Sequence, residues 1–243
     1  MTPADQQIAF IGAGNVATHM AKALRNAGMK IKAVYSHTLV SAQTLAAEVE
    51  ADAINDIADL PEANIFVYCV KDDVLPKIAA INSLRFPNAL HIHTSGSTPA
   101  NVFLNQWHGV IYPMQTFSKN AALNFSEVRC YIEGSNRQSL KMIDNLTRSL
   151  TSHVSELDTE ARLCLHAAAV FACNFANHCF ALAEKLLKEK GIAVYRAYVG
   201  NYFTSLDMMG ATLTLMKLDE ELKELLDMPV NTVGLKQKGK EKG

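Results

Sequence analysis

The chain has 243 residues, of which 49% are hydrophobic and 19% charged, and its formal net charge is −1. This length accommodates two unequal globular domains. A net charge so close to zero excludes a long-range field that would attract nucleic acid or an anionic membrane, so we expect a small-molecule partner. The N-terminus lacks a basic stretch followed by a long apolar run, and no apolar run approaches the about 20 residues that span a bilayer. We therefore expect a cytoplasmic protein.

The cysteines are odd in number and follow no regular spacing, which predicts reduced, mostly buried thiols: Cys69, Cys130, Cys164, Cys173 and Cys179. Three of them share a segment with His166 and His178. On a helix these side chains would spread around much of the circumference, which is unlike a metal-ligand set. We therefore predict no metal site.

In chain order, the first part alternates strand and helix patterns. Strands are predicted at 8–11, 31–35, 65–70, 89–92, 110–112 and 128–132, and helices at 16–27, 41–50 and 138–150. The segment 65–70 is almost wholly apolar, as in a parallel strand that is buried on both faces. This alternation predicts an α/β, Rossmann-type domain with a doubly wound, mostly parallel sheet over residues 1–157.

The second part is predicted to be all helical, over residues 158–234. Asp158 or Thr159 can cap a helix that runs to Lys190 without Gly or Pro. At 1.5 Å per residue it would be about 47 Å long, which exceeds a small domain, so part of it must pack on another surface. Apolar residues on more than one side of this helix favour a homodimer. A second helical stretch is predicted to about residue 227, and the lysine-rich segment 235–243 is predicted to be disordered.

A dinucleotide fingerprint of the form G-x-G-x-x-A follows the first strand, at Gly12-Ala13-Gly14-Asn15-Val16-Ala17. The first glycine permits the turn, the second lets the backbone approach a pyrophosphate, and the small alanine allows close packing. Asn15 and Val16 begin the helix, whose N–H groups and dipole favour phosphate. The alternative is a glycine-rich turn that serves packing alone.

The end of the second strand indicates which cofactor is bound. NAD-selective sites place a carboxylate there for the ribose 2′-OH, whereas this chain has Ser36-His37-Thr38. Two hydroxyls and an imidazole suit a 2′-phosphate, so NADP is favoured over NAD. The alternative is an ordinary polar loop.

Two later segments should line the cofactor crevice, because ligands of open α/β sheets lie at the carboxyl ends of strands. Val70, Lys71 and Asp72 follow the third predicted strand, where Asp72 or Asp73 could instead cap the next helix. His93-Thr94-Ser95 follows the next strand and offers an imidazole and hydroxyls beside the expected nicotinamide. It could also be a Ser/Thr-rich turn.

These motifs together resemble the Rossmann-like proteins that carry a DUF2520 C-terminal domain, over roughly residues 5 to 195. The resemblance rests on the segments 12–17, 36–38, 70–73, 93–97, 112–117 and 166–175. It implies a relation to pyrroline-5-carboxylate reductase and to the 6-phosphogluconate and 3-hydroxyisobutyrate dehydrogenases, whose helical domains form dimers. Tyr112 departs from the family, which usually has His there. Val170 departs from the hydroxy-acid dehydrogenases, which carry a catalytic Lys four residues before the asparagine that matches Asn174.

The function expected from these features is that of an NADP-dependent oxidoreductase, which transfers hydride between nicotinamide and a small carbonyl or imine compound. His166 is the candidate proton donor or substrate ligand, Asn174 could hold a substrate oxygen, and Ser95 faces them across the site. His166 could instead be an ordinary hydrogen-bonded helix residue. An NADP-binding sensor or scaffold without turnover, and a deazaflavin-linked NADP oxidoreductase, are alternatives. The sequence leaves the substrate and the direction of the reaction open.

Overall fold

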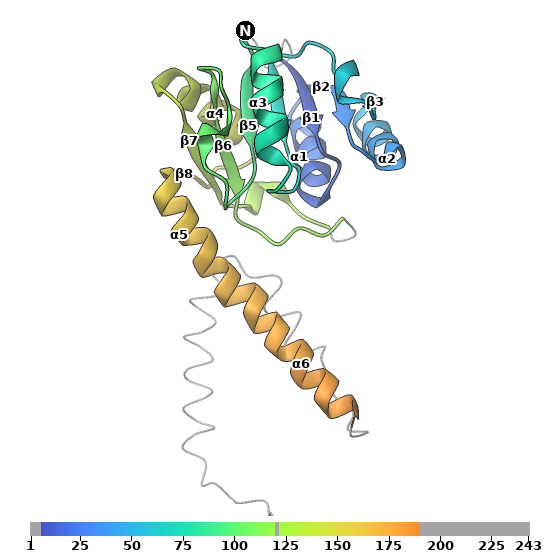
Figure 1. Cartoon of the computed structure of the whole chain (residues 1–243), viewed down its shortest axis with the longest axis vertical. Helices are drawn as coiled ribbons and strands as arrows, with labels where there is room; N and C mark the ends of the chain where they lie inside the picture. The colour runs from blue at the N-terminus through green and yellow to red at the C-terminus, as the bar shows by residue number, and fades with distance from the viewer. Residues whose placement is uncertain (1–5, 120–121, 190–243) are drawn as a thin grey trace, which may run out of the picture. The chain divides into compact units, whose positions relative to one another are not determined.

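The computed structural model describes residues 6–119 and 122–189. Within them one sheet has the strand order β3-β2-β1-β4-β5-β6-β7-β8 (Figure 1). Its strands are β1 Gln7–Ile11, β2 Lys30–Tyr35, β3 Asp52–Ile54, β4 Ile65–Tyr68, β5 Leu90–His93, β6 His108–Pro113, β7 Cys130–Gly134 and β8 Val154–Glu156. Neighbouring strands are parallel except β6 and β7, which are antiparallel. The predicted doubly wound, mostly parallel Rossmann-type sheet is confirmed.

The direction of winding reverses between β1 and β4, which are neighbours in the sheet although β2 and β3 lie between them in the chain. Such a switch point leaves a crevice at the carboxyl ends of the two strands, where open α/β sheets bind their ligands. The fingerprint follows β1, so it lies at this crevice.

Helices cover both faces of the sheet. Helices α1 (Asn15–Asn26), α2 (Leu39–Val49) and α4 (Arg137–Arg148) pack on the face to which Ile8 and Phe10 point. Helix α3 (Leu75–Arg85) packs on the other face, against Ala9 and Ile11. Short 3-10 turns complete the domain at η2 Ile57–Asp59, η3 Ala100–Val102 and η4 Phe125–Glu127. Since successive residues of a strand point to opposite faces, the near-continuous apolar strands fill both layers of core.

Some predicted boundaries differ from the structure. Strand β4 ends at Tyr68 rather than at residue 70, and the three-residue strands β3 and β8 were not predicted, because so short a segment shows no period. Helix α3 has Val74 at its N-cap position. Neither Asp72 nor Asp73 therefore caps it, which corrects that alternative.

The predicted long helix consists of three consecutive parts, α5 Thr159–Ala169, a π turn η5 Val170–Phe175, and α6 Ala176–Glu189. Asp158 caps it, since its Oδ1 accepts the N–H of Ala161 at 2.8 Å. The π turn was not predicted. The expected end at Lys190, the second helical stretch to about 227 and the segment 235–243 lie outside the described residues.

The burial of the cysteines differs from the expectation. Cys164 and Cys179 are exposed on the long helix, and Cys130 alone of the five is fully buried, so the prediction of mostly buried thiols is wrong.

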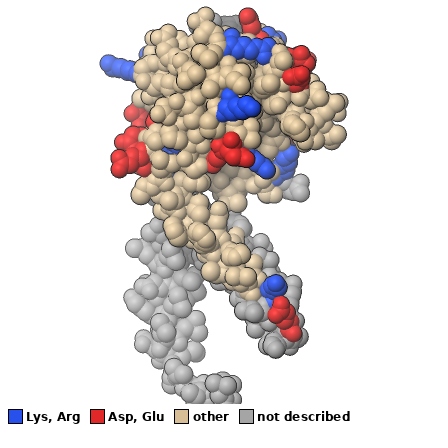
Figure 2. All heavy atoms as spheres, viewed as in Figure 1, with Lys and Arg blue, Asp and Glu red and all other residues tan. Residues whose placement is uncertain are grey.

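Lys and Arg are interspersed with Asp and Glu on the face shown in Figure 2, without a patch of one sign. Among the described helices, none combines the length and hydropathy needed to cross a membrane.

Candidate functional site at the carboxyl edge of the sheet

The fingerprint turn, residues 12–17, uses its two glycines differently. Gly12 has a φ of +112°, and a Cβ there would lie 2.3 Å from the carbonyl oxygen of Cys69. The fold itself therefore requires glycine at this position. A Cβ at Gly14 would meet only that same oxygen, at 4.0 Å, and Gly14 has a φ of −82°. No described protein atom requires glycine at position 14, which leaves room for a ligand against the backbone.

The first turn of α1 offers a place for an anion. Gly14 is the N-cap residue, no side chain caps the helix, and its first turn has no acidic residue. The N–H groups and the positive end of the helix dipole therefore meet no competing carboxylate in that turn. Ala17 is fully buried, which lets α1 approach the sheet closely. This geometry fits a pyrophosphate, which helix N-termini bind through backbone N–H groups.

A loop after β6, residues 114–119, lies against the same end of α1. Asn15 Nδ2 donates to the Phe117 carbonyl oxygen at 2.8 Å, and His19 Nε2 lies 2.8 Å from the Ser118 carbonyl oxygen. The rings of His19 and Phe117 have centroids 5.7 Å apart. Because the Asn15 side chain is engaged in this way, its backbone N–H is the group that it can offer to a phosphate.

The loop after β2 carries the three residues predicted to select the cofactor. Ser36 is half-buried, whereas His37 and Thr38 are exposed. The Thr38 N–H donates to Ser36 Oγ at 3.3 Å, and Thr38 is the N-cap residue of α2 without a side-chain cap bond. The loop itself contains no carboxylate.

The loop after β4 meets both the fingerprint turn and the loop after β5. A Cβ at Gly12 would lie 3.3 Å from the Val70 side chain. Ser97 Oγ donates to the Asp72 carboxylate. Lys71 is exposed. The structure thus brings the predicted residues 70–72 and the 93–97 segment to one edge of the sheet.

The predicted hydroxyls of the 93–97 segment are mostly engaged in building its turn. Thr94 Oγ1 donates to the Tyr68 carbonyl oxygen at 3.3 Å. Ser95 Oγ accepts the N–H groups of Ser97 and Thr98 at 3.1 and 3.0 Å and lies 3.0 Å from Thr98 Oγ1. These contacts fill the hydrogen-bonding capacity of the Ser95 hydroxyl. Direct contact between that hydroxyl and a substrate would therefore need the turn to open.

His93 lies in the core and not beside the crevice. Its side chain is fully buried, Nδ1 accepts the Ser95 N–H at 3.2 Å, and Nε2 lies 3.3 Å from the Pro99 carbonyl oxygen. Burial, reinforced by the nearby Arg162 charge, lowers the pKa of His93 to about 3, so the ring is neutral. The expectation of an imidazole beside the nicotinamide is thereby corrected, because this ring supports the loop from below.

The long helix meets the sheet at a set of contacts that we call the α5 junction, made by Ser95, Gly96, Tyr112, Glu133, Arg162 and His166. Arg162 is fully buried, and its Nη1 donates to the carbonyl oxygens of Ser95 and Gly96, each at 3.1 Å. Its Nη2 forms an ion pair with Glu133 Oε2 at 3.0 Å, and Thr159 Oγ1 donates to Glu133 Oε1 at 2.6 Å. One buried guanidinium thus ties α5 both to β7 and to the loop after β5.

His166 lies one helical turn after Arg162, against the same loop. Its Nδ1 is 3.0 Å from the Tyr112 hydroxyl, and the two rings meet edge to face with centroids 5.7 Å apart. A Cβ at Gly96 would lie 2.4 Å from His166 Nδ1 and 2.8 Å from Tyr112 Cε2. Glycine at position 96 therefore lets the imidazole approach the loop, and the structure places His166 beside Ser95-Gly96.

Asn174 is exposed in the π turn, and no contact with residues 93–97 is recorded for it within the described part of the chain. A regular α-helix would place it about 80° around the axis from His166. A π turn holds more residues per turn, so each of its residues rotates the chain by a smaller angle. The angle between Asn174 and His166 is therefore expected to be smaller than about 80°.

Sequence reasoning missed three residues of the α5 junction: Tyr112, Glu133 and Arg162. Arg162 has a recognisable sequence context, because it is a charged residue that directly precedes the apolar run from Leu163. A charged residue that is buried at such a position needs a partner. Tyr112 stands out in the sequence only as a departure from a family pattern. Nothing in the local sequence of Glu133 indicates its partner.

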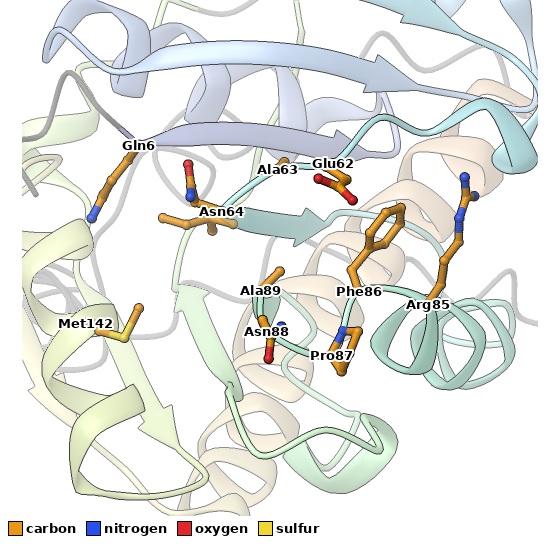
Figure 3. Close-up of a pocket in the computed structure, with 11 residues that line it drawn as sticks. Gln6, Glu62, Ala63, Asn64, Arg85, Phe86, Pro87, Asn88, Ala89 and Met142 are labelled. Atoms are coloured by element: carbon orange, nitrogen blue, oxygen red, sulfur yellow. The ribbon is translucent and has the colours of Figure 1, made fainter.

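A hollow elsewhere on the domain does not belong to this site. Figure 3 shows residues that line a cavity, among them Asn64 and Ala89, at the amino ends of β4 and β5. The volume of this cavity is ≈ 350 Å³. Arg85, which also lines it, donates to the carbonyl oxygens of Ile57 and Ala58 at 2.9 and 2.7 Å. Ligands of open α/β sheets bind at the opposite, carboxyl ends of the strands. This cavity is therefore not the cofactor site.

Comparison with protein families divides the chain in two. Residues 7–89 match the family described as NADP oxidoreductase, coenzyme F420-dependent. Residues 128–221 match a domain of unknown function, DUF2520. The first match contains the fingerprint turn and the loops after β2 and β4, and the second contains Glu133, Arg162 and His166.

Solved structures share this fold. Prephenate dehydrogenase from A. aeolicus, solved with hydroxyphenyl propionate and NAD+, is 16% identical, with a TM-score of 0.66 over 93% of this chain and 90% of that one. At that identity the likeness shows the fold alone. The curated proteins give a shorter match, 50% identity over 54 residues, to the dihydroxyacetone-binding subunit DhaK of a Listeria innocua kinase. It spans 22% of this chain and only 16% of that subunit, about a sixth of its length.

A longer likeness concerns a Bacteroides fragilis protein of known structure, the "putative NADP oxidoreductase BF3122". The two chains are 35% identical, with a TM-score of 0.73, and the match covers 93% of this chain and 83% of that one. Identity at this level over most of both chains, together with the family match at residues 7–89, shows the family. The chain belongs to the NADP oxidoreductase family that BF3122 represents.

Proposed function

We propose that this oxidoreductase binds NADP(H) at the fingerprint turn and transfers hydride between its nicotinamide and a small carbonyl or imine compound. The observation that carries the proposal is the open position at Gly14, where a Cβ would meet no protein atom closer than 4.0 Å. When bound, the nicotinamide supplies or accepts the hydride. The residues of this chain bind its pyrophosphate at α1 and hold the substrate at the carboxyl edge of the sheet.

We propose NADP rather than NAD as the cofactor, from the loop after β2. Exposed His37 and Thr38 and the hydroxyl of Ser36 can donate to a 2′-phosphate, and the loop has no carboxylate to repel it. NAD-dependent relatives would place such a carboxylate there for the ribose 2′-OH.

The substrate site is proposed where Ser95-Gly96 faces His166 and Asn174. His166 would donate to the substrate, and Asn174 would hold a substrate oxygen, which the smaller rotation per residue in the π turn supports. His166→Ala and Asn174→Ala should lower turnover or substrate affinity while NADPH affinity is unchanged. His178→Ala, at an exposed position of the same helix, is the matched control.

The experiment that tests the proposal measures binding and turnover separately. Calorimetry should show that the parent protein binds NADPH more tightly than NADH. Ser36→Asp should reverse this preference, because the carboxylate repels the 2′-phosphate. Ser36→Asn, which introduces an uncharged side chain of the same shape as Asp, should not reverse it. A panel of carbonyl and imine compounds should reveal substrate-dependent NADPH oxidation. Binding without any turnover would favour the sensor or scaffold, and oxidation that needs a deazaflavin would favour the deazaflavin-linked reaction. Tighter binding of NADH by the parent protein would contradict the NADP assignment.

We also propose that the long helix pairs with a second copy of the chain. Phe171, Phe175 and Leu182 are 69%, 52% and 48% exposed on it, and the rings of Phe171 and Phe175 lie together with their centroids 5.1 Å apart. A monomer by light scattering at micromolar concentration would contradict the homodimer.

The division into domains 1–157 and 158–234 and the cytoplasmic location stay predictions. The DhaK match spans too little of that subunit to support a kinase proposal.

A further inference from the structure

The Tyr112 and His166 pair is more specific than a packing contact. Tyr112 is 8% exposed, and burial raises the pKa of its phenol to about 12, so the hydroxyl keeps its proton at neutral pH. A buried phenol O–H needs an acceptor. The acceptor recorded for it within the described residues is His166 Nδ1, at 3.0 Å. Tyr112 therefore donates, and Nδ1 accepts.

This direction fixes the tautomer of the imidazole. A neutral imidazole carries one N–H, so a ring that accepts at Nδ1 has its proton on Nε2. The ring has little freedom to turn away, because the Gly96 backbone lies directly against Nδ1. Within the described part of the chain no hydrogen bond is recorded for Nε2.

We propose that Tyr112 is the positioning residue of the substrate site, holding His166 as an Nε2–H donor for an acceptor atom of the substrate such as a carbonyl oxygen. The donor role rests on the proposed function, whereas the tautomer does not. Arg162, Tyr131 and Cys173 are the other groups whose charge or dipole acts on Tyr112. None of them forms a recorded hydrogen bond with the His166 ring, so the tautomer depends on Tyr112.

The tautomer can be observed directly by nitrogen NMR of the full chain labelled with ¹⁵N-histidine, since protonated and unprotonated ring nitrogens resonate far apart. The His166 signals are assigned from their loss in His166→Gln. We expect the proton of the neutral ring on Nε2 in the parent protein. Tyr112→Phe should mix the two tautomers, and Tyr131→Phe, which removes the hydroxyl of the ring stacked on Tyr112, should leave them unchanged. Gly96→Ala, which pushes a methyl group against Nδ1, should also disturb them.

An Nδ1–H tautomer in the parent protein, or a Tyr112→Phe spectrum identical to the parent, would overturn the assignment. Pyruvate added with NADP+ probes the donor role, and it should shift the Nε2–H resonance, whereas ethylamine, which offers no acceptor when protonated, should not. A shift with ethylamine alone would overturn that role. NADPH calorimetry on the same samples separates the two failures, because a protein that binds no NADPH refutes the proposed function and leaves the tautomer result intact.

Discussion

The fingerprint turn and the α5 junction lie at the same edge of the sheet but are built from different groups. The fingerprint turn consists of backbone, with a glycine that the fold requires at Gly12 and an open position at Gly14. The α5 junction consists of side chains, with Arg162 and Glu133 as an ion pair and Tyr112 bonded to His166. The proposed cofactor end is therefore built from one strand and one helix, whereas the proposed substrate end forms only when α5 packs on the sheet.

This difference teaches which changes should affect folding and which should affect binding. A backbone cradle can lose its ligand without losing the fold, because no protein atom occupies the space that the ligand uses. A buried ion pair cannot lose one partner without leaving the other charge uncompensated. The comparison predicts separable effects at the fingerprint turn and coupled effects at the α5 junction.

The largest effect is expected at Arg162. Arg162→Met keeps the length of the side chain but leaves Glu133 unpaired and two carbonyl oxygens without their donor, so the free energy of unfolding should fall by about 3 to 5 kcal/mol. Arg148→Met is the matched control, because the pair of Arg148 with Asp144 is exposed to solvent and should contribute little to stability. Urea denaturation measures both. Equal stability of the two variants would refute the structural role of the α5 junction.

The second prediction separates the two glycines of the fingerprint. Gly12→Ala should destabilise the protein by about 3 kcal/mol, since it combines a strained positive φ with a contact to the Cys69 carbonyl oxygen. Gly14→Ala should leave unfolding within about 1 kcal/mol of the parent, yet lower NADPH affinity at least about tenfold, because the methyl group enters the pyrophosphate position. Unfolding and calorimetric titration of both variants test this. Unchanged NADPH affinity in folded Gly14→Ala would show that the cofactor binds elsewhere.

The sequence predicts the backbone-built region well, because its signals are local. Apolar strands, helix patterns and the Gly12 and Gly14 spacing all lie within short windows, and the sheet, α1 and the fingerprint turn follow them. Strands β3 and β8 are not predicted, because a strand of three residues is too short to show an alternating pattern of apolar and polar residues.

The side-chain region depends on partners distant in sequence, and its prediction was incomplete. Arg162 lies 29 residues from Glu133, and His166 lies 54 residues from Tyr112. The expectation that His166 lies near Ser95 rests on the order of the elements and on the family resemblance, whereas the burial of the His93 ring could not be foreseen from an alternating His-Ile-His segment. The π turn around Asn174 contains no Gly or Pro, so its sequence does not indicate a change in helix geometry.

The smallest expected effect is a loss of stability at acidic pH. It extends the comparison to β5, the strand that leads into the α5 junction. Burial lowers the pKa of His91 to about 4 and that of His93 to about 3, below the value of about 6.5 expected in the unfolded chain. The unfolded state therefore binds more protons below pH 6.5, and stability that is complete above this pH is lost as the pH falls toward the folded values. Each ring should add about 1.4 kcal/mol per pH unit to the slope of the unfolding free energy between about pH 6 and 5. His91→Gln, which retains a donor and an acceptor for Phe86 and Tyr68, should remove one such contribution. Urea titrations across this range decide the matter, and a slope equal to that of the parent protein would mean that His91 is already charged in the folded state.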